Sequence, residues 1–199
     1  MALTLIIGGA RSGKSRLAER LAEASGRPVL FIATMQPEDG ESKSRVAAHR
    51  ASRPAAWRTI EEPRDLARAL SSAHAGDFVI VDCLTVWAAN VLLSNVENDD
   101  APAEDEIAAT MKLVASASVA LAEQAAMFDG EVAVVTNEVG AGVVPPYPLG
   151  RVFRDALGAA NATLAARADR VYHVVAGLAV DLKTLGARPI DEFAPRSES

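Results

Sequence analysis

"GGARSGKS", residues 8–15, directly follows the apolar run 3–7 and decides the fold. Its spacing, G-x-x-x-x-G-K-[ST], is that of a phosphate-binding loop between a strand and a helix. Glycines let backbone N–H groups approach phosphate oxygens, and the N-terminus of the helix expected over 15–24 adds partial positive charge. We therefore predict that Lys14 contacts the terminal phosphates and that the Ser15 hydroxyl binds Mg²⁺. The predicted nucleotide-binding residues of this loop are Gly8, Gly9, Ala10, Arg11, Ser12, Gly13, Lys14 and Ser15.

Further apolar runs along the chain predict the rest of a sheet. These runs are 29–33, 78–83, 132–136 and 171–175. Continuous apolar runs are typical of strands that are buried on both faces. Stretches rich in Ala, Leu, Arg and Glu predict helices at about 43–52, 63–74, 104–127 and 151–168. We therefore predict an α/β fold: a single-domain P-loop NTPase with a RecA-like, mainly parallel central sheet and helices on both faces.

Composition restricts location and partners. The 199 residues suffice for one catalytic domain, placed at 1–185, with a flexible tail at 186–199. A net charge of −6 argues against broad nucleic-acid binding, and no apolar run is long enough to span a membrane. The single cysteine, Cys83, excludes an internal disulfide and is typical of a reducing compartment. Because the short apolar N-terminus lacks a basic segment, it predicts a strand rather than a signal peptide, and we expect a cytoplasmic protein.

A second magnesium ligand is expected at the end of another central strand. In "FVIVDC", Asp82 follows four apolar residues, which is the arrangement of a Walker-B aspartate. Alternatively, Asp82 caps the next helix. Because ligands bind at the carboxyl ends of parallel strands, we expect Asp82 to lie near the loops that follow Ile7, Ala33 and Thr136.

The segment 44–63 places a histidine between arginines. If 43–52 is helical, Arg45 and His49 share one face, and Arg53 lies near the same line. The arginines would neutralise a triphosphate and disfavour a protonated imidazole, which leaves His49 neutral and able to attack phosphorus. Alternatively, the helix faces solvent and its histidine is incidental. Spacing alone does not decide between these two interpretations.

Six segments of the chain carry a resemblance to a known family. They are "GGARSGKS", "FIAT", "RVAAHRASRPAAWRTIEEP", "VDCLTVW", "VTNEVGAGVVP" and "RVFRDALGAANATLAARADRVYHVVAGL". The first is shared by many unrelated NTPases, whereas "AAHRASRPAAWRT" together with "TNEVGAGVVP" is highly specific. On these segments the chain resembles the bifunctional adenosylcobinamide kinases and adenosylcobinamide-phosphate guanylyltransferases of cobalamin biosynthesis.

The resemblance implies two reactions that use ATP or GTP and Mg²⁺. First, a nucleoside triphosphate phosphorylates the aminopropanol hydroxyl of adenosylcobinamide. Second, a histidine attacks the α-phosphorus of GTP, releases pyrophosphate and holds GMP, which passes to adenosylcobinamide phosphate to give adenosylcobinamide-GDP. The histidine of the family motif falls on His49. Because it reaches the α-phosphorus only if its helix moves, we expect the segment 36–54 to swing over the nucleotide.

The resemblance also assigns nucleotide contacts outside the phosphate loop. They are Ala33, Thr34, Met35, Arg50, Ala51, Ser52, Arg53, Glu61 and Asp82. Glu61 would accept hydrogen bonds from guanine or ribose; alternatively, it is an N-terminal acid of the helix near Pro63. Asn137 and Glu138 either shape the site or only hold the loop before the "GAG" turn.

Two segments depart from the family pattern, namely Asn161-Ala162, where Asn-Gln is frequent, and Leu178-Ala179-Val180. They concern corrinoid contacts or subunit packing rather than nucleotide chemistry. The resemblance implies a homotrimer, for which the Ala-rich stretch 104–127 offers a surface. Two other functions remain open: a P-loop kinase for a small metabolite, in which His49 only contacts phosphate, and a RecA-like binding or assembly module with little turnover.

Overall fold

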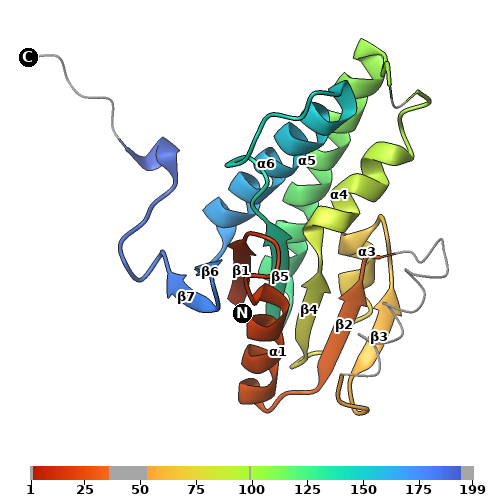
Figure 1. The fold of residues 1–199 in the computed structure, drawn as a ribbon. Helices are drawn as coiled ribbons and strands as arrows, with labels where there is room; N and C mark the ends of the chain where they lie inside the picture. Colours follow the sequence, from red (N-terminus) through yellow and green to blue (C-terminus); the bar gives the residue numbers. More distant parts are fainter. Residues whose placement is uncertain (1, 36–52, 99, 194–199) are drawn as a thin grey trace, which may run out of the picture.

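A seven-stranded sheet forms the centre of the protein (Figure 1). The computed structural model describes residues 2–35, 53–98 and 100–193. The strands are β1 (Ala2–Gly8), β2 (Val29–Ala33), β3 (Arg58–Glu61), β4 (Phe78–Asp82), β5 (Glu131–Asn137), β6 (Arg170–Val175) and β7 (Leu178–Asp181). Their spatial order is β3-β2-β4-β5-β1-β6-β7, and all pairs are parallel except β6–β7. The predicted mainly parallel sheet is confirmed.

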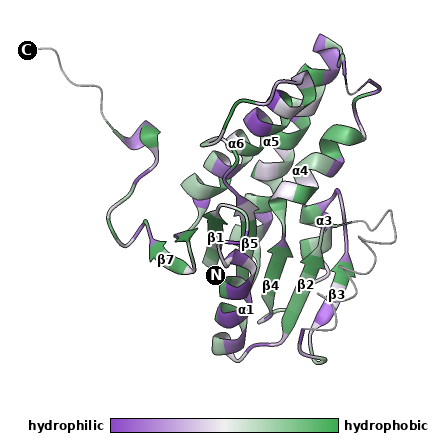
Figure 2. Ribbon diagram, viewed as in Figure 1, coloured by the Kyte–Doolittle hydropathy of each residue, from purple (hydrophilic) through white to green (hydrophobic). Residues whose placement is uncertain are grey.

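The helices cover the two faces of this sheet unequally. They are α1 (Lys14–Ser25), α3 (Leu66–Leu70), α4 (Leu84–Leu93), α5 (Glu104–Met127) and α6 (Pro148–Arg167), with a 3-10 turn, η1 (Ile190–Glu192). In the described residues, the core on one face is built from α3, α4, α5 and α6, and the core on the other face from α1. Strands β2 and β4 are hydrophobic along their length because they are buried on both sides (Figure 2). The predicted helices on both faces are therefore confirmed.

Local sequence signals explain where the long helices begin and end. Helix α1 lies between Gly13 and Gly26, whose φ values of 103° and 65° suit a residue without a side chain. Helix α5 begins with three acidic residues, which favour the positive end of the helix dipole. One of them, Glu106, accepts a hydrogen bond from the N–H of Ala103 at 3.1 Å. Within the described residues, no helix is long and apolar enough to cross a membrane.

Some predicted elements need correction. The helix expected at 63–74 is only the short α3, because Asp65 caps its start, with Oδ1 accepting from the N–H of Arg68 at 3.0 Å, and Gly76 turns the chain after it. The prediction missed α4, whose sequence LTVWAANVLL is apolar without a helical period, and the short strands β3 and β7. The helix expected at 43–52 lies outside the described residues. Of the predicted tail, η1 belongs to the described part and 194–199 does not.

Candidate active site

Side-chain alternation along the strands places the site on the α1 face of the sheet. In β4, Val81 belongs to the core under α3–α6 and Ile80 to the core under α1, so Asp82 faces α1. The same alternation directs the last residues of the neighbouring strands toward α1. These residues are Gly8, Ala33, Glu61 and Asn137. All of them stand at the carboxyl edge, where the sequence predicted a ligand site.

The phosphate loop requires its glycines for steric reasons. A Cβ at Gly8 would collide with the carbonyl oxygen of Val174 on β6. Gly13 has φ +103° directly before α1, and Arg11 also adopts a positive φ, 54°. Residues 11–16 line a cavity of about 240 Å³. The loop therefore forms a concave surface at the place where its sequence predicts a phosphate site.

The β6–β7 hairpin supports the phosphate loop from the side. Its turn residues Ala176 and Gly177 both have positive φ, 51° and 81°, as in the two-residue turns that match the twist of paired strands. The N–H of Gly177 donates to the carbonyl oxygen of Ser12 at 2.9 Å. This hairpin was not predicted to take part in the site, because the sequence does not show that β6 lies beside β1 or that β7 folds back on β6.

Lys14 is buried inside the loop, with 7% of its surface exposed. Its Nζ donates to the carbonyl oxygen of Gly9 at 2.6 Å and lies 3.5 Å from the hydroxyl of Ser12. Burial lowers the pKa of Lys14, while the negative charge of Asp82 acts to raise it. A bound polyphosphate would place negative charge beside this ammonium. Binding of the polyphosphate and protonation of Lys14 therefore favour each other.

Thr34 fixes the segment that carries Asp82. The Thr34 hydroxyl accepts from the N–H of Cys83 at 2.8 Å and donates to its carbonyl oxygen at 2.9 Å. The N–H of Thr34 donates to the carbonyl oxygen of Asp82 at 3.1 Å, and the Asn90 side chain donates to the carbonyl of Thr34 at 2.8 Å. Thr34 is fully buried, and these hydrogen bonds orient the segment that carries Asp82. The nucleotide contact of Thr34 stays a prediction. Burial, and then the charge of Asp82, raises the pKa of the Cys83 thiol, which keeps it neutral.

A second set of hydrogen bonds fixes the end of β5. The Thr136 hydroxyl donates to Oδ1 of Asn161 at 2.7 Å, and Nδ2 of Asn161 donates to the carbonyl of Asn137 at 3.0 Å. The N–H of Asn137 donates to the Thr85 hydroxyl at 2.7 Å, and the N–H of Glu138 to the carbonyl of Gly8 at 3.1 Å. The end of β5 is thus joined to α4, α6 and the phosphate loop.

Asn137 and Glu138, whose roles the sequence left open, have different surroundings in the structure. The carboxylate of Glu138 accepts from the N–H of Gly140 at 2.5 Å and so holds the "GAG" turn. Asn137 stands on the α1 face beside Gly8 instead. Sequence reasoning also missed the positioning residues Thr85, Asn90 and Asn161; for Asn90, the usable signal was a single Asn within the apolar helix α4.

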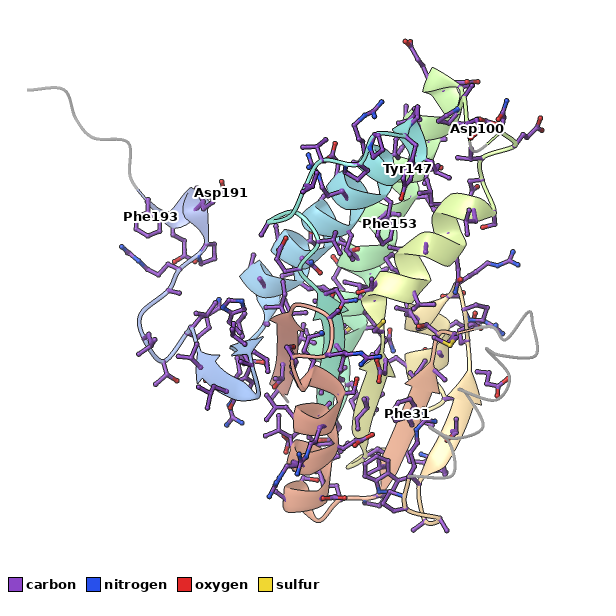
Figure 3. All side chains as sticks on the ribbon, viewed as in Figure 1. Phe31, Asp100, Tyr147, Phe153, Asp191 and Phe193 are labelled. Carbon is purple, nitrogen blue, oxygen red and sulfur yellow. The ribbon has the colours of Figure 1, made fainter. Side chains whose placement is uncertain are left out.

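Several predicted nucleotide contacts lie after β2, before β3 or at the end of β3. Arg53 stacks over the ring of Phe31, 3.5 Å from its centroid. Phe31 lies on the α1 side of β2 (Figure 3). Glu61 pairs in register with Ala33, and Met35 closes the described part of the loop after β2. The predicted residues His49, Arg50, Ala51 and Ser52, together with most of the segment 36–54 that we expect to move, lie outside the described residues.

Glu62, rather than Glu61, is the acid at the start of α3. Its carboxylate accepts from the N–H groups of Arg64 and Asp65 at 3.0 and 3.1 Å and from the guanidinium of Arg68 at 2.5 Å. Desolvation acts to raise the pKa of Glu62, but these three donors outweigh it and hold the pKa below its ordinary value. Glu61 is thereby left at the strand end, on the site face.

Replacing Glu62 with glutamine is expected to lower the free energy of unfolding by about 1 kcal/mol at neutral pH. Because the folded-state pKa is below the ordinary 4.5, the carboxylate stabilises the fold above that pH. This contribution disappears as the pH falls through the folded-state pKa. Urea titrations at several pH values measure it, with Glu23→Gln on the exposed side of α1 as the control. If the difference in unfolding free energy between the wild type and Glu62→Gln persists at low pH, the stabilising role of the Glu62 carboxylate is contradicted.

The chain is similar to known proteins over most of its length. The model of the family "Cobinamide kinase / cobinamide phosphate guanyltransferase" matches residues 4–182. The chain is 48% identical to the "Bifunctional adenosylcobalamin biosynthesis protein CobP" of Pseudomonas aeruginosa, covering 90% of this chain and 96% of that protein. It is 40% identical to the protein CobU of Salmonella typhimurium, covering 91% and 99%. A crystal structure of the RadB recombinase aligns with a TM-score of 0.44 and 17% identity, over 86% of this chain and 73% of that one. With a family match that spans the whole sheet, this chain belongs to the cobinamide kinase / cobinamide phosphate guanyltransferase family.

Proposed function

We propose that this protein phosphorylates adenosylcobinamide with ATP or GTP and then transfers GMP from GTP to adenosylcobinamide phosphate, through a covalent guanylyl-His49. The products of the second reaction are adenosylcobinamide-GDP and pyrophosphate. The observation that carries the proposal is the convergence of the phosphate loop, Lys14 and Asp82 on one face and one edge of the sheet. Membership of the family connects that site to the two reactions.

In the first reaction, the substrate hydroxyl attacks the γ-phosphorus. A bond from the hydroxyl oxygen to phosphorus forms, the bond to the β–γ bridging oxygen breaks, and the hydroxyl proton is released. The loop amides and Lys14 stabilise the charge that accumulates on the phosphate oxygens. Burial of Lys14 strengthens this effect because little water competes with the phosphate.

In the second reaction, His49 would act as the nucleophile. A neutral imidazole nitrogen attacks the α-phosphorus of GTP, the bond from that phosphorus to the α–β bridging oxygen breaks, and pyrophosphate leaves with the electrons of that bond. A phosphate oxygen of the corrinoid then attacks the same phosphorus and releases the histidine. The support is the family motif, in which His49 stands between Arg45 and Arg53. We propose Arg50, Ala51 and Ser52 as further nucleotide contacts on the same basis.

The donor set fits Mg²⁺ carried by a nucleotide. In the described residues, no three His, Cys, Asp or Glu side chains converge into a metal cage. Magnesium suits such a site, because it commonly takes one or two protein oxygens and completes its shell with phosphates and water. Ser15, at the start of α1, and Asp82 would hold it. When bound, Mg²⁺ neutralises charge on the transferred phosphates.

Labelled nucleotides test both halves of the proposal. The protein is incubated with adenosylcobinamide and triphosphate labelled at either the α- or the γ-phosphorus. We expect γ-label on the corrinoid after the first step, and α-label from GTP on the protein in a bond that is labile to acid and stable to base. Transfer of γ-label without α-label on protein would leave only a kinase. Neither transfer would point to a binding module.

We also propose the homotrimer and the cytoplasmic location that the resemblance implied. Exposed apolar side chains follow β6 in the chain and support a subunit contact there: Leu178, Leu185 and Ile190 are 77%, 72% and 87% exposed, and Phe193 lies away from the sheet (Figure 3). In α5, by contrast, Val114, Leu121 and other small or apolar residues pack into the core. Sedimentation of the purified protein tests the assembly, and a single species of monomer mass would contradict it.

A further inference from the structure

We propose that Asn137 is a catalytic residue of the kinase step: its side-chain amide donates a hydrogen bond to the γ-phosphate, and Thr85 and Asn161 position it. The inference rests on the proposed function and assigns a residue role within the same site. It is carried by three features of the end of β5. The backbone of Asn137 is fixed on both sides, its side chain faces the phosphate loop, and that side chain makes no other hydrogen bond within the described residues.

The backbone of Asn137 has both of its polar groups held by side chains from the opposite layer. Its N–H donates to the Thr85 hydroxyl on α4 at 2.7 Å, and its carbonyl accepts from Nδ2 of Asn161 on α6 at 3.0 Å. Asn161 is itself 5% exposed, and its Oδ1 accepts from Thr136. Such fixation by a hydroxyl and a buried amide is what precise placement of a functional group requires.

The side chain of Asn137 faces the phosphate loop. Along β5, Val135 packs in the α1 core and Thr136 bonds to α6 on the other face, so Asn137 returns to the α1 side. Asn137 is the register partner of Gly8, the first residue of the loop, and the N–H of the next residue donates to the Gly8 carbonyl at 3.1 Å. Strand β5 lies between β4, which carries Asp82, and β1.

The Asn137 amide is available for a ligand. Within the described parts of the chain, its side chain has no hydrogen-bond partner, whereas Thr85, Asn161 and Glu138 are all engaged. The residue is half-buried, so a ligand rather than bulk water would satisfy the amide when the loop is filled. An amide N–H suits a phosphate oxygen, because it donates without adding or removing a proton.

The two reactions place different demands on this hydrogen bond. In the kinase step, the γ-phosphorus is transferred, and charge on its oxygens changes in the transition state. In guanylyl transfer, the γ-phosphate stays within the pyrophosphate that leaves. A hydrogen bond to it therefore stabilises the bound substrate and the transition state almost equally. A contact of the first kind changes kcat, and one of the second kind changes KM.

Asn137→Ala is expected to lower kcat of the kinase step roughly 10- to 100-fold, as for loss of a hydrogen bond to a charged group. In guanylyl transfer the same variant is expected to raise KM for GTP about tenfold and change kcat less than about twofold. Asn95→Ala is the control for loss of an Asn side-chain amide: Asn95 follows the end of α4, where its amide donates to the carbonyl of Val91 at 2.7 Å. That variant is expected to leave both reactions unchanged.

Nucleotide binding supplies a readout that does not depend on turnover. We expect Asn137→Ala to weaken binding of a non-hydrolysable ATP analogue about tenfold and to leave ADP binding unchanged, since ADP lacks the γ-phosphate. Calorimetry with the full-length protein measures both affinities. Equal weakening of the two nucleotides would show that Asn137 only maintains the loop, and would overturn the inference.

Thr85 distinguishes positioning from a merely structural role. Thr85→Ala removes the acceptor for the N–H of Asn137 and is expected to reproduce the kinetic split at smaller size, roughly three- to tenfold in kinase kcat. Thr85→Ser keeps the hydroxyl and is expected to retain most of the wild-type kinase kcat. Loss of both reactions in equal proportion in either Ala variant would overturn the proposal.

If the wild-type protein performs guanylyl transfer but no kinase step, the first half of the proposed function fails and this inference fails with it. If both wild-type steps proceed and Asn137→Ala alters neither, only the inference fails.

Discussion

Replacing Lys14 with methionine is expected to lower kcat of the kinase step about 10³-fold, within the range for removal of a cation that stabilises phosphoryl transfer. Lys14 is the buried cation of the phosphate loop, and its Nζ already lies inside the loop, 2.6 Å from the Gly9 carbonyl. Methionine has similar volume and flexibility but no charge. The measurement is transfer of γ-label to adenosylcobinamide under saturating nucleotide.

The same variant is expected to unfold at an equal or higher denaturant concentration at neutral pH. Burial lowers the pKa of Lys14, so the folded state pays a penalty for the charged ammonium below that pKa. The penalty disappears as the pH rises above the ordinary value of 10.5, where the lysine is neutral in both states. The advantage of the methionine variant should therefore shrink at high pH.

Lys112→Met on the exposed side of α5 is the control for loss of one positive charge. It is expected to change neither kinase rate nor its pH dependence. A Lys14→Met protein that keeps more than about a tenth of wild-type kcat would show that the loop amides and the metal suffice without the lysine. A variant that loses both activity and stability would contradict the pKa argument.

Replacing His49 with alanine is expected to abolish α-label on the protein and to reduce guanylyl transfer at least 10³-fold, because no other nucleophile is proposed to form the intermediate. Phosphorylation of adenosylcobinamide is expected to continue, since the γ-phosphorus is attacked by the substrate hydroxyl. The measurement is a pair of assays on one preparation, with α-labelled GTP and γ-labelled ATP.

His74→Ala is the matched control for this variant. His74 is an exposed histidine in the turn before β4, at the edge of the sheet opposite the phosphate loop. Its replacement is expected to leave both labels at wild-type level. Persistence of α-label in the His49 variant would assign the nucleophile to another residue, and simultaneous loss of γ-transfer would indicate that His49 serves nucleotide binding instead.

The sequence was sufficient for the elements whose signals are local. Apolar runs such as 78–83 are buried on both faces, and glycines that need positive φ, such as Gly13 and Gly26, mark the ends of α1. Prediction from the sequence failed where the local pattern of apolar and polar residues does not indicate the type of element. Helix α4 is apolar all round, because it lies between the sheet and α6, and so shows no amphipathic period.

The sequence by itself determined the phosphate-loop motif, through the spacing within one short segment, and the family, through several such segments together. Only the tertiary structure decided which residues support the site. Thr34 holds the Cys83 backbone across 49 positions, and Asn161 holds Asn137 across 24. Such pairs depend on the order of the strands in the sheet and on the face of the sheet to which the last side chain of each strand points. Parallel crossovers bring distant segments to one edge of the sheet, and no local pattern in the chain records which of them become neighbours.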